Sequence, residues 1–163
     1  VQLLTGGAAT KATVVREMPK ARFVHLATHG LLDDFQGQGL PGAVALAPAA
    51  GDDGLLSSGE IANLNLNAEL VVLSACDTGR GRITGDGVIG LSRSLLGGGA
   101  AAVVVSLWAV PDAPTAELMT LFYRQLLLKS DKAVALRQAM LQMMAQHPDP
   151  RDWAAFTLMG EAD

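Results

Sequence analysis

Residues 69–79 read ELVVLSACDTG, and the interpretation of the whole chain starts from this stretch. Its apolar part is short and rich in β-branched and leucine residues. It ends at Cys76, the only cysteine of the chain, before a turn that contains glycine. A run of this kind, bounded by turn residues, predicts a buried β-strand. Such a strand would deliver a thiol at its carboxyl end.

Residues 23–30 read FVHLATHG and repeat the same design upstream, with an apolar run that ends at His29 and a glycine. If the two strands are neighbours in a parallel sheet, His29 and Cys76 leave that sheet side by side. Open α/β sheets place their functional sites at this carboxyl edge. The two stretches together predict a site built on a histidine and a cysteine.

Strand-like and helix-like patterns alternate along the rest of the chain. The strand expected at 101–107 is apolar on both faces, as a strand covered by helices on each side should be. The alternation predicts an α/β sandwich with a mostly parallel central sheet, in a single domain over residues 1–163. The other expected strands are 22–28, 43–47, 70–75 and 153–159, and the expected helices are 10–18, 57–63, 86–96, 112–126 and 131–146.

Two local patterns lead to more detailed expectations. Asp112 is expected to cap the helix that comes after it, with Pro114 in the first turn of that helix. Helical spacing in the last helix predicts an inward-facing apolar stripe. The members of this stripe are Val134, Leu136, Met140, Met143 and Met144.

The composition argues against several classes of protein. Half of the residues are hydrophobic and 17% are charged, which is typical of a folded domain. The net charge is −4 and no stretch gathers Lys and Arg, so we expect no nucleic-acid partner. No apolar run reaches the roughly 18 residues of a spanning helix, so we expect no membrane partner. A single cysteine allows no internal disulfide, which fits a reducing compartment such as the cytoplasm.

Two other patterns allow different interpretations. Residues 85–90 (GDGVIG) match the dinucleotide fingerprint, but about nine residues separate them from the preceding strand, whereas that fold needs its glycines directly after the strand. His25 and His29 stand four positions apart, as in zinc peptidases, but Leu26 occupies the place of the required glutamate and the segment is strand-like. We therefore expect neither a cofactor nor a metal.

A histidine beside a cysteine suffices for nucleophilic acyl transfer. The thiolate is the reactive form, and an adjacent imidazole accepts its proton or holds it as an ion pair. The backbone amides of Gly30 and Cys76 are the candidates for binding the oxyanion, because glycine lets the substrate approach closely. A lone cysteine in an apolar run is also a common core residue, and a single histidine is often structural, so the residues alone leave both interpretations open.

Five blocks of the sequence resemble the CHAT domain, the caspase-like module found beside tetratricopeptide repeats. The resemblance covers nearly the whole chain and implies a caspase-like fold and a cysteine endopeptidase whose dyad is His29 and Cys76. The histidine comes first, and its separation from the cysteine is close to the roughly 50 residues found in caspases. The five blocks are residues 25–30 (HLATHG), 70–79 (LVVLSACDTG), 87–93 (GVIGLSR), 103–112 (VVVSLWAVPD) and 153–160 (WAAFTLMG).

The same resemblance implies partners and limits. The substrate would be a protein or peptide, and a tetratricopeptide-repeat region of a longer protein would regulate the activity. The family's domain normally carries an earlier strand and helix, so we expect a fragment that lacks its N-terminal strand. Ser74 stands where caspases have glutamine, and aspartate specificity is therefore not carried over. The alternative is a catalytically silent caspase-like scaffold or interaction module.

Four residues are candidates for substrate binding. In caspase-like enzymes the strand after the cysteine strand lines part of the substrate groove, which places Ser106 and Trp108 near it. Asp77 and Asp112 are expected near the same edge of the sheet, where they would attract a basic residue before the scissile bond. The competing interpretations are a helix cap for Asp112 and a solvated turn residue for Asp77.

Overall fold

The structure, a computed structural model, describes residues 1–31, 42–74, 85–128 and 131–163. The helices of this part are α1 (Lys11–Glu17), α2 (Ser58–Ile61), α3 (Gly85–Gly97), α4 (Asp112–Leu127) and α5 (Lys132–Gln146), with the 3-10 turns η1 (Gly6–Ala8), η2 (Met18–Lys20) and η3 (Pro150–Asp152). The strands are β1 (Phe23–Leu26), β2 (His29–Leu31), β3 (Ala43–Ala45), β4 (Leu55–Ser57), β5 (Leu70–Leu73), β6 (Ala102–Ser106) and β7 (Phe156–Gly160).

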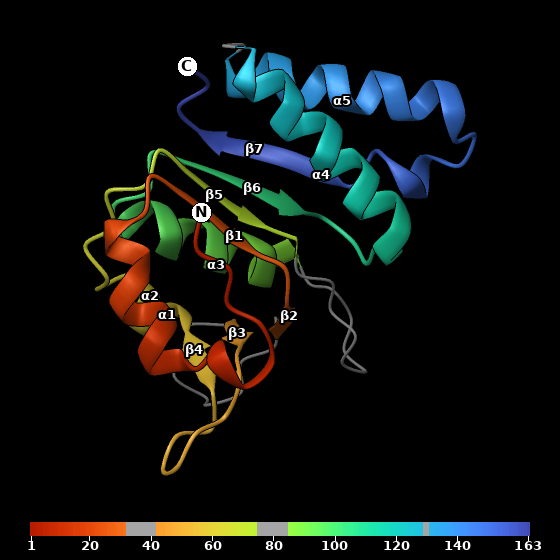
Figure 1. The fold of residues 1–163 in the computed structure, drawn as a ribbon. Coiled ribbons are helices and arrows are strands. Elements are labelled where there is room, and N and C mark those ends of the chain that lie inside the picture. The colour runs from red at the N-terminus through yellow and green to blue at the C-terminus, as the bar shows by residue number, and fades with distance from the viewer. Residues whose placement is uncertain (32–41, 75–84, 129–130) are drawn as a thin grey trace.

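Four strands form the main sheet, in the spatial order β1-β5-β6-β7. The pairs β1–β5 and β5–β6 are parallel, and β7 closes the sheet as an antiparallel strand on β6. Figure 1 shows these strands between α4 and α5 on one side and the remaining helices on the other. This arrangement confirms the predicted class, a caspase-like α/β sandwich with a mostly parallel sheet.

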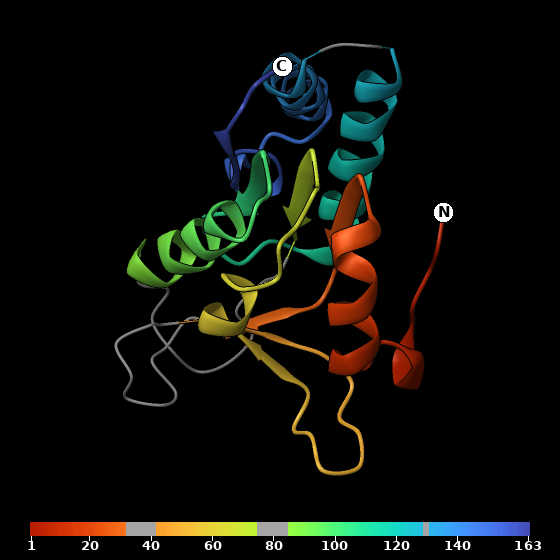
Figure 2. The ribbon, with the colours of Figure 1, turned by 90° about the vertical axis from the view of Figure 1, so that its left-hand side faces the viewer.

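Each face of the main sheet has its own apolar core. The turned view in Figure 2 shows α4 and α5 on the opposite side of the strands from α1 and α3. The central strand β5 contributes to both: Val71 and Leu73 face α1 and α3, whereas Leu70 and Val72 face α4 and α5. None of these four side chains is more than 5% exposed. Each contributes about 1.5–3 kcal/mol through burial. A strand covered on both faces has no polar side, which explains its uninterrupted apolar sequence.

A second sheet begins where the chain leaves β1. In this sheet β2, β3 and β4 are antiparallel neighbours, and β2 begins at His29. Between the two sheets, Thr28 donates its hydroxyl to the backbone carbonyl of Ala45 in β3. The prediction that one strand continues to residue 28 is therefore wrong, because the main-sheet strand ends at Leu26. The apolar pattern continues across this bend and does not reveal the change of sheet.

Three helices begin at capping residues that the sequence supplies. The side chain of Thr10 accepts a backbone hydrogen bond at the start of α1, and that of Asp131 does the same for α5. Ser57 and Glu60 form a reciprocal capping box at α2. Such caps satisfy amides that a helix leaves without internal partners, and each contributes about 1 kcal/mol. These caps confirm the predicted starts of the three helices.

The start of α4 differs from the prediction. Pro111 occupies the N-cap position, and no side-chain cap hydrogen bond forms there, so the expectation that Asp112 caps this helix is wrong. Asp112 is instead the first helical residue, where its negative charge interacts favourably with the helix dipole. Pro114 lies in the first turn, as expected.

The apolar stripe predicted for α5 is partly wrong. Leu136 and Met143 are buried, but Val134 is 43% exposed and Met144 is 47% exposed. The buried face includes two alanines, Ala135 and Ala139, both without exposed area. Small residues allow close packing of α5 in the second core, and this packing turns the larger Val134 and Met144 outward.

Candidate functional site

The predicted site residues stand in the sequence at or after the carboxyl ends of the three parallel strands of the main sheet. These strands end at Leu26 in β1, Leu73 in β5 and Ser106 in β6. Because parallel strands end at one edge, residues that leave them gather there. Cys76 and Asp77 lie outside the described residues. The described part of the site consists of the histidine segment after β1 and the segment after β6.

His29 and Gly30 form the start of β2, directly after the bend at the end of β1. His29 is exposed and pairs with Ala45 of β3, whereas Gly30 is buried and pairs with Val44. The second sheet therefore holds the backbone of the predicted base, which is exposed as a whole residue. A base held in this way can act on a substrate without a large loss of backbone entropy.

A second histidine, His25, lies at the centre of a polar cluster near the same edge. Its Nε2 is 2.8 Å from the hydroxyl of Ser74, the residue directly after β5. Its Nδ1 is 2.9 Å from the hydroxyl of Tyr123 on α4, and the two rings lie 5.6 Å apart. One imidazole thus links β1, the exit of β5 and α4.

Burial keeps the members of this cluster uncharged. Although His25 as a whole residue is exposed, desolvation of its ring lowers its pKa below the usual 6.5. Burial also raises the pKa of Tyr123 to about 12. At neutral pH both groups are neutral, so the imidazole donates through one nitrogen and accepts through the other. The tautomer of the ring decides which of the two hydroxyls receives its proton.

Sequence reasoning considered His25 only as a zinc ligand and did not find this cluster. The alternation along β1 is the signal that was available: Val24 and Leu26 face the first core, so His25 must face the α4 side. Ser74, directly after β5, is an even number of residues from Leu70 and Val72, which face that side too. The partner on α4 lies 98 residues from His25, and no local pattern identifies it.

The candidates for substrate binding divide into buried and exposed groups. Ser106 is buried in β6 opposite Phe156 of β7. Trp108 packs against the second core, and its indole nitrogen is buried with no acceptor among the described residues. Asp112 is exposed at the start of α4. The tertiary structure therefore offers a carboxylate and a buried N–H donor in the segment after β6.

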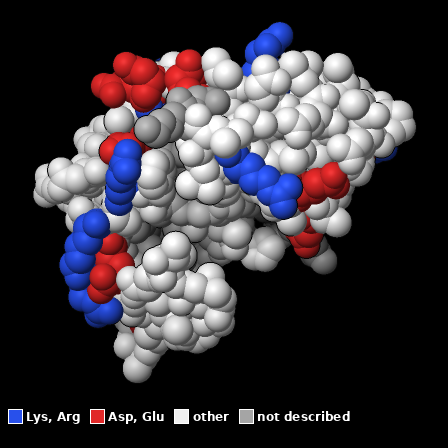
Figure 3. All heavy atoms as spheres, turned by 45° about the horizontal axis from the view of Figure 1, so that its top comes forward, with Lys and Arg blue, Asp and Glu red and all other residues white. Residues whose placement is uncertain are grey.

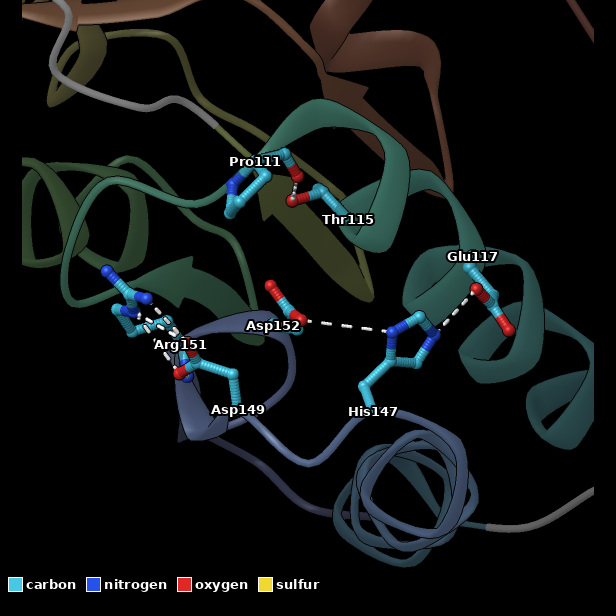
Figure 4. Close-up of polar contacts among 7 residues, drawn as sticks. All are labelled: Pro111, Thr115, Glu117, His147, Asp149, Arg151 and Asp152. Atoms are coloured by element: carbon cyan, nitrogen blue, oxygen red, sulfur yellow. Dashed lines mark hydrogen bonds and ion pairs between the residues drawn. The ribbon is translucent and has the colours of Figure 1, made fainter.

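Another polar cluster surrounds His147, which comes directly after α5 (Figure 4). Its Nε2 is 3.0 Å from a carboxylate oxygen of Glu117 on α4, and its Nδ1 is 3.8 Å from Asp152 in η3. The two carboxylates approach opposite nitrogens of one ring, so they do not converge on a common point. The cluster is suited to joining helices and does not have the geometry of a metal centre.

The remaining alternatives receive no support from the geometry. Among residues 1–31, 42–74, 85–128 and 131–163, no group of His, Cys, Asp and Glu could hold a metal ion. His25 and His29 belong to different sheets, and His25 is already bonded to two hydroxyls. The glycines of the dinucleotide-like pattern lie within α3 and not in a turn directly after β5. The described residues therefore add no support to the zinc or the dinucleotide interpretation.

A hollow of about 670 Å³ lies beside α1 and α2, and none of the predicted site residues lines it. Its polar walls are already paired: Lys11 and Glu60 form an ion pair at 2.6 Å, and Glu60 also belongs to the capping box with Ser57. The hydrogen bond to Glu60 and the neighbouring acids raise the pKa of Lys11, which therefore stays charged. These groups stabilise the start of α2 and offer no nucleophile or base.

Charged side chains are mixed on the molecular surface. On the face drawn in Figure 3, uncharged side chains cover most of the area, and several Lys and Arg side chains lie beside Asp or Glu. An extended basic track of the kind that binds a phosphate backbone is not seen on this face. Within the described ranges, every helix is too short or too polar to cross a bilayer.

Comparison with known proteins gives a consistent result. A family model described as "CHAT domain" matches residues 1–161. Two similar relatives are the tetratricopeptide repeat protein 28 of Mus musculus and that of Homo sapiens, each 31% identical over 192 aligned residues. The alignments cover 98% of this chain and 8% of each relative. The chain thus corresponds to a small part of these longer proteins.

Proposed function

This chain belongs to the CHAT domain family, and we propose that it is a caspase-like cysteine endopeptidase domain that hydrolyses peptide bonds of protein substrates. His29 and Cys76 form the catalytic dyad. The repeat-containing names of its relatives support a regulatory tetratricopeptide-repeat region in the full-length protein. A lone thiol stays reduced in a reducing compartment, and we propose the cytoplasm as its location.

The register of the main sheet is the observation that carries this proposal. Each residue of β1 pairs with the residue 47 positions later in β5, as Leu26 does with Leu73. The separation of His29 and Cys76 is the same, so each stands three positions after one member of that pair. Adjacent strands are about 4.8 Å apart, and three residues extend the chain by at most about 11 Å. This register supports an imidazole and a thiol that leave the sheet edge as neighbours.

The register of β5 against β6 supports a substrate-binding role for Trp108 in the same way. Leu73 of β5 pairs with Val105 of β6, and Trp108 stands three positions after Val105 just as Cys76 stands three positions after Leu73. Trp108 packs with part of its ring against the second core, and we propose that its exposed part lines the substrate groove. Ser106 lies two positions before Trp108, at the end of β6, and supports the wall of the groove.

The proposed reaction begins when the thiolate of Cys76 attacks the carbonyl carbon of the scissile peptide bond. The amides of Gly30 and Cys76 stabilise the resulting oxyanion. The C–N bond then breaks, and the amine leaves with a proton from the His29 imidazolium. Water adds to the thioester, His29 accepts a proton from it, and the carboxylic acid product leaves as the thiol is restored.

An electrophilic peptide ketone tests this proposal, because Cys76 is the only thiol of the chain. We expect His29→Ala to lower the second-order labelling rate by about a hundredfold, the range expected for loss of a general acid–base. His147→Gln is the matched control, since it removes another histidine and should label at the wild-type rate. Equal, slow labelling of the wild type and His29→Ala would contradict the peptidase proposal and favour the silent scaffold.

Substrate preference at the scissile position is proposed to depend on acidic residues. Asp112 is exposed and not occupied by a cap hydrogen bond, so its carboxylate is available to a basic side chain. Asp77, one position after the nucleophile, is proposed to act with it. We expect a ketone with lysine before the reactive carbonyl to label faster than its alanine counterpart, and Asp112→Asn to reduce the difference. Faster labelling by the alanine peptide would contradict an acidic pocket.

A further inference from the structure

The peptidase proposal uses His29 and leaves the His25 cluster without a role. His25 is the only described side chain that bonds both to α4 and to the residue after β5, through Tyr123 at 2.9 Å and Ser74 at 2.8 Å. Two hydrogen bonds at opposite ring nitrogens fix both the position and the rotation of the imidazole. The cluster therefore holds the Ser74 hydroxyl at a defined distance from α4.

The position of Ser74 matters because this residue is close to the proposed nucleophile in the sequence. Cys76 is two residues further along, and two residues span at most about 7 Å between Cα atoms. A restraint on Ser74 consequently limits the region that the sulfur can reach. Reaction rates respond strongly to such restraints, since a misplacement of about 1 Å can lower a rate by about a hundredfold.

α4 is a rigid support for this restraint. Leu118 and Phe122 of this helix have no exposed area and pack in the second core with Leu70 and Val72 of β5. The next residue, Tyr123, lies beside Phe122, with ring centres 5.4 Å apart. Core packing thus fixes the phenol, the phenol fixes His25, and His25 fixes Ser74.

The neutral state of the cluster suits this role. Because burial lowers the pKa of His25 and raises that of Tyr123, neither carries a charge near pH 7. A neutral imidazole between two hydroxyls needs no counter-ion and does not compete electrostatically with a thiolate–imidazolium pair nearby. The two histidines can therefore differ in function: His29 transfers a proton in the proposed reaction, while His25 keeps its hydrogen bonds in the neutral form.

We infer that Tyr123, His25 and Ser74 form a positioning relay for the nucleophile of the proposed peptidase, with each residue acting through the next and none touching the substrate. The inference rests on the proposed function of Cys76. It adds three residues to the site, and one of them, Tyr123 on α4, comes from a segment that the sequence does not connect with catalysis. The relay also makes the packing of α4 a determinant of the reaction rate.

Single hydroxyl deletions test the relay with little change in volume. We expect Tyr123→Phe and Ser74→Ala each to lower the rate of Cys76 labelling by a peptide ketone by about tenfold, a partial loss of positioning. Ser74→Thr keeps the hydroxyl and should stay within about twofold of the wild type. The matched control is Thr120→Ala on α4, which removes an exposed hydroxyl bonded only to its own helix at Ala116.

A second readout separates positioning from general damage to the fold. The pH profile of Cys76 alkylation by iodoacetamide reports formation of the thiolate, which the relay does not control. We expect its midpoint to be unchanged in Tyr123→Phe and Ser74→Ala, whereas His29→Ala should shift it. Mass spectrometry of the labelled chain should locate the ketone adduct on Cys76.

Three results would overturn the relay. If the ketone labels Tyr123→Phe and Ser74→Ala at the wild-type rate but labels His29→Ala slowly, the relay is wrong and the peptidase proposal stands. Equal labelling by the wild type and His29→Ala would remove the peptidase and the relay with it. An adduct on Ser74 would show that this residue is itself a nucleophile and not a positioning residue.

Discussion

His25 and His147 lie in two regions of the molecule and make the same kind of connection with different partners. Each bonds to α4 through one ring nitrogen and approaches a second element through the other. The partners of His25 are two hydroxyls at the carboxyl edge of the main sheet, whereas those of His147 are two carboxylates between α4 and η3. The first set is neutral and the second is charged.

This difference assigns the two histidines different tasks. Desolvation of its ring lowers the pKa of His25, so the imidazole is neutral near pH 7 while it bonds to the two hydroxyls. The side chains of His147 and Glu117 are 28% and 41% exposed, and ion pairs at such positions contribute at most about 1 kcal/mol. A histidine bonded to neutral groups is suited to positioning, and one between exposed carboxylates only joins surfaces.

The largest effect is expected from a variant that weakens α4, the helix to which both histidines bond. Phe122→Ala deletes a side chain of α4 that has no exposed area, and such deletions lower the free energy of unfolding by about 3–5 kcal/mol. Urea denaturation measures this loss. The matched control is Leu127→Ala on the same helix, where the side chain is 84% exposed and the change should stay within about 0.5 kcal/mol. Similar stability of the two variants would show that α4 is not held by its buried face.

Removal of each histidine in turn tests the comparison directly. His25→Ala leaves the partly buried Tyr123 hydroxyl and the Ser74 hydroxyl without their partner, so the free energy of unfolding should fall by about 1–3 kcal/mol. His147→Ala leaves carboxylates that water can reach, and the loss should be below about 1 kcal/mol. Denaturant midpoints of both variants at a pH of about 7.5, above the ordinary histidine pKa, provide the measurement. A larger loss for His147→Ala would reverse the assignment of roles.

The smallest expected effect is the dependence of stability on pH. Unfolded His25 takes up a proton near pH 6.5, but folded His25 has a lower pKa, so below pH 6.5 the unfolded state binds more protons. Stability should therefore fall as the pH decreases from about 6.5 through the lowered pKa. NMR titration of the three histidines, with urea midpoints at several pH values, measures both quantities. A titration of His25 above its ordinary pKa of 6.5 would contradict the neutral state of the relay.

Much of the fold could be predicted from local patterns. The apolar runs predicted a buried strand at 70–75 and a strand covered on both faces at 101–107, and the expected helices at 10–18, 57–63 and 131–146 begin at the observed caps. Both are short-range effects, since burial on two faces leaves no polar positions and caps act within one turn of a helix. The sequence separation of the proposed dyad also equals the register of β1 against β5.

The errors arose where distant contacts overrule a local pattern. The segment from residue 23 to 30 reads as one strand, but a hydrogen bond from Thr28 to β3 directs the chain into a second sheet. Asp112 has the chemistry of a cap, but Pro111 occupies that position. In α5, close packing of alanines determines which large residues face outward. None of these contacts lies within the window that a periodicity can describe.

The sequence by itself determined that this chain is an α/β domain of the CHAT family with a histidine and a cysteine after matching strands. Only the tertiary structure decided what surrounds the histidine segment. The alternation along β1 tells which face His25 occupies, but the residue that covers this face comes from a helix 98 positions away. Hydrogen bonding between side chains depends on ångström-scale distances, and these are fixed by packing of the whole core and not by the order of residues in any one segment.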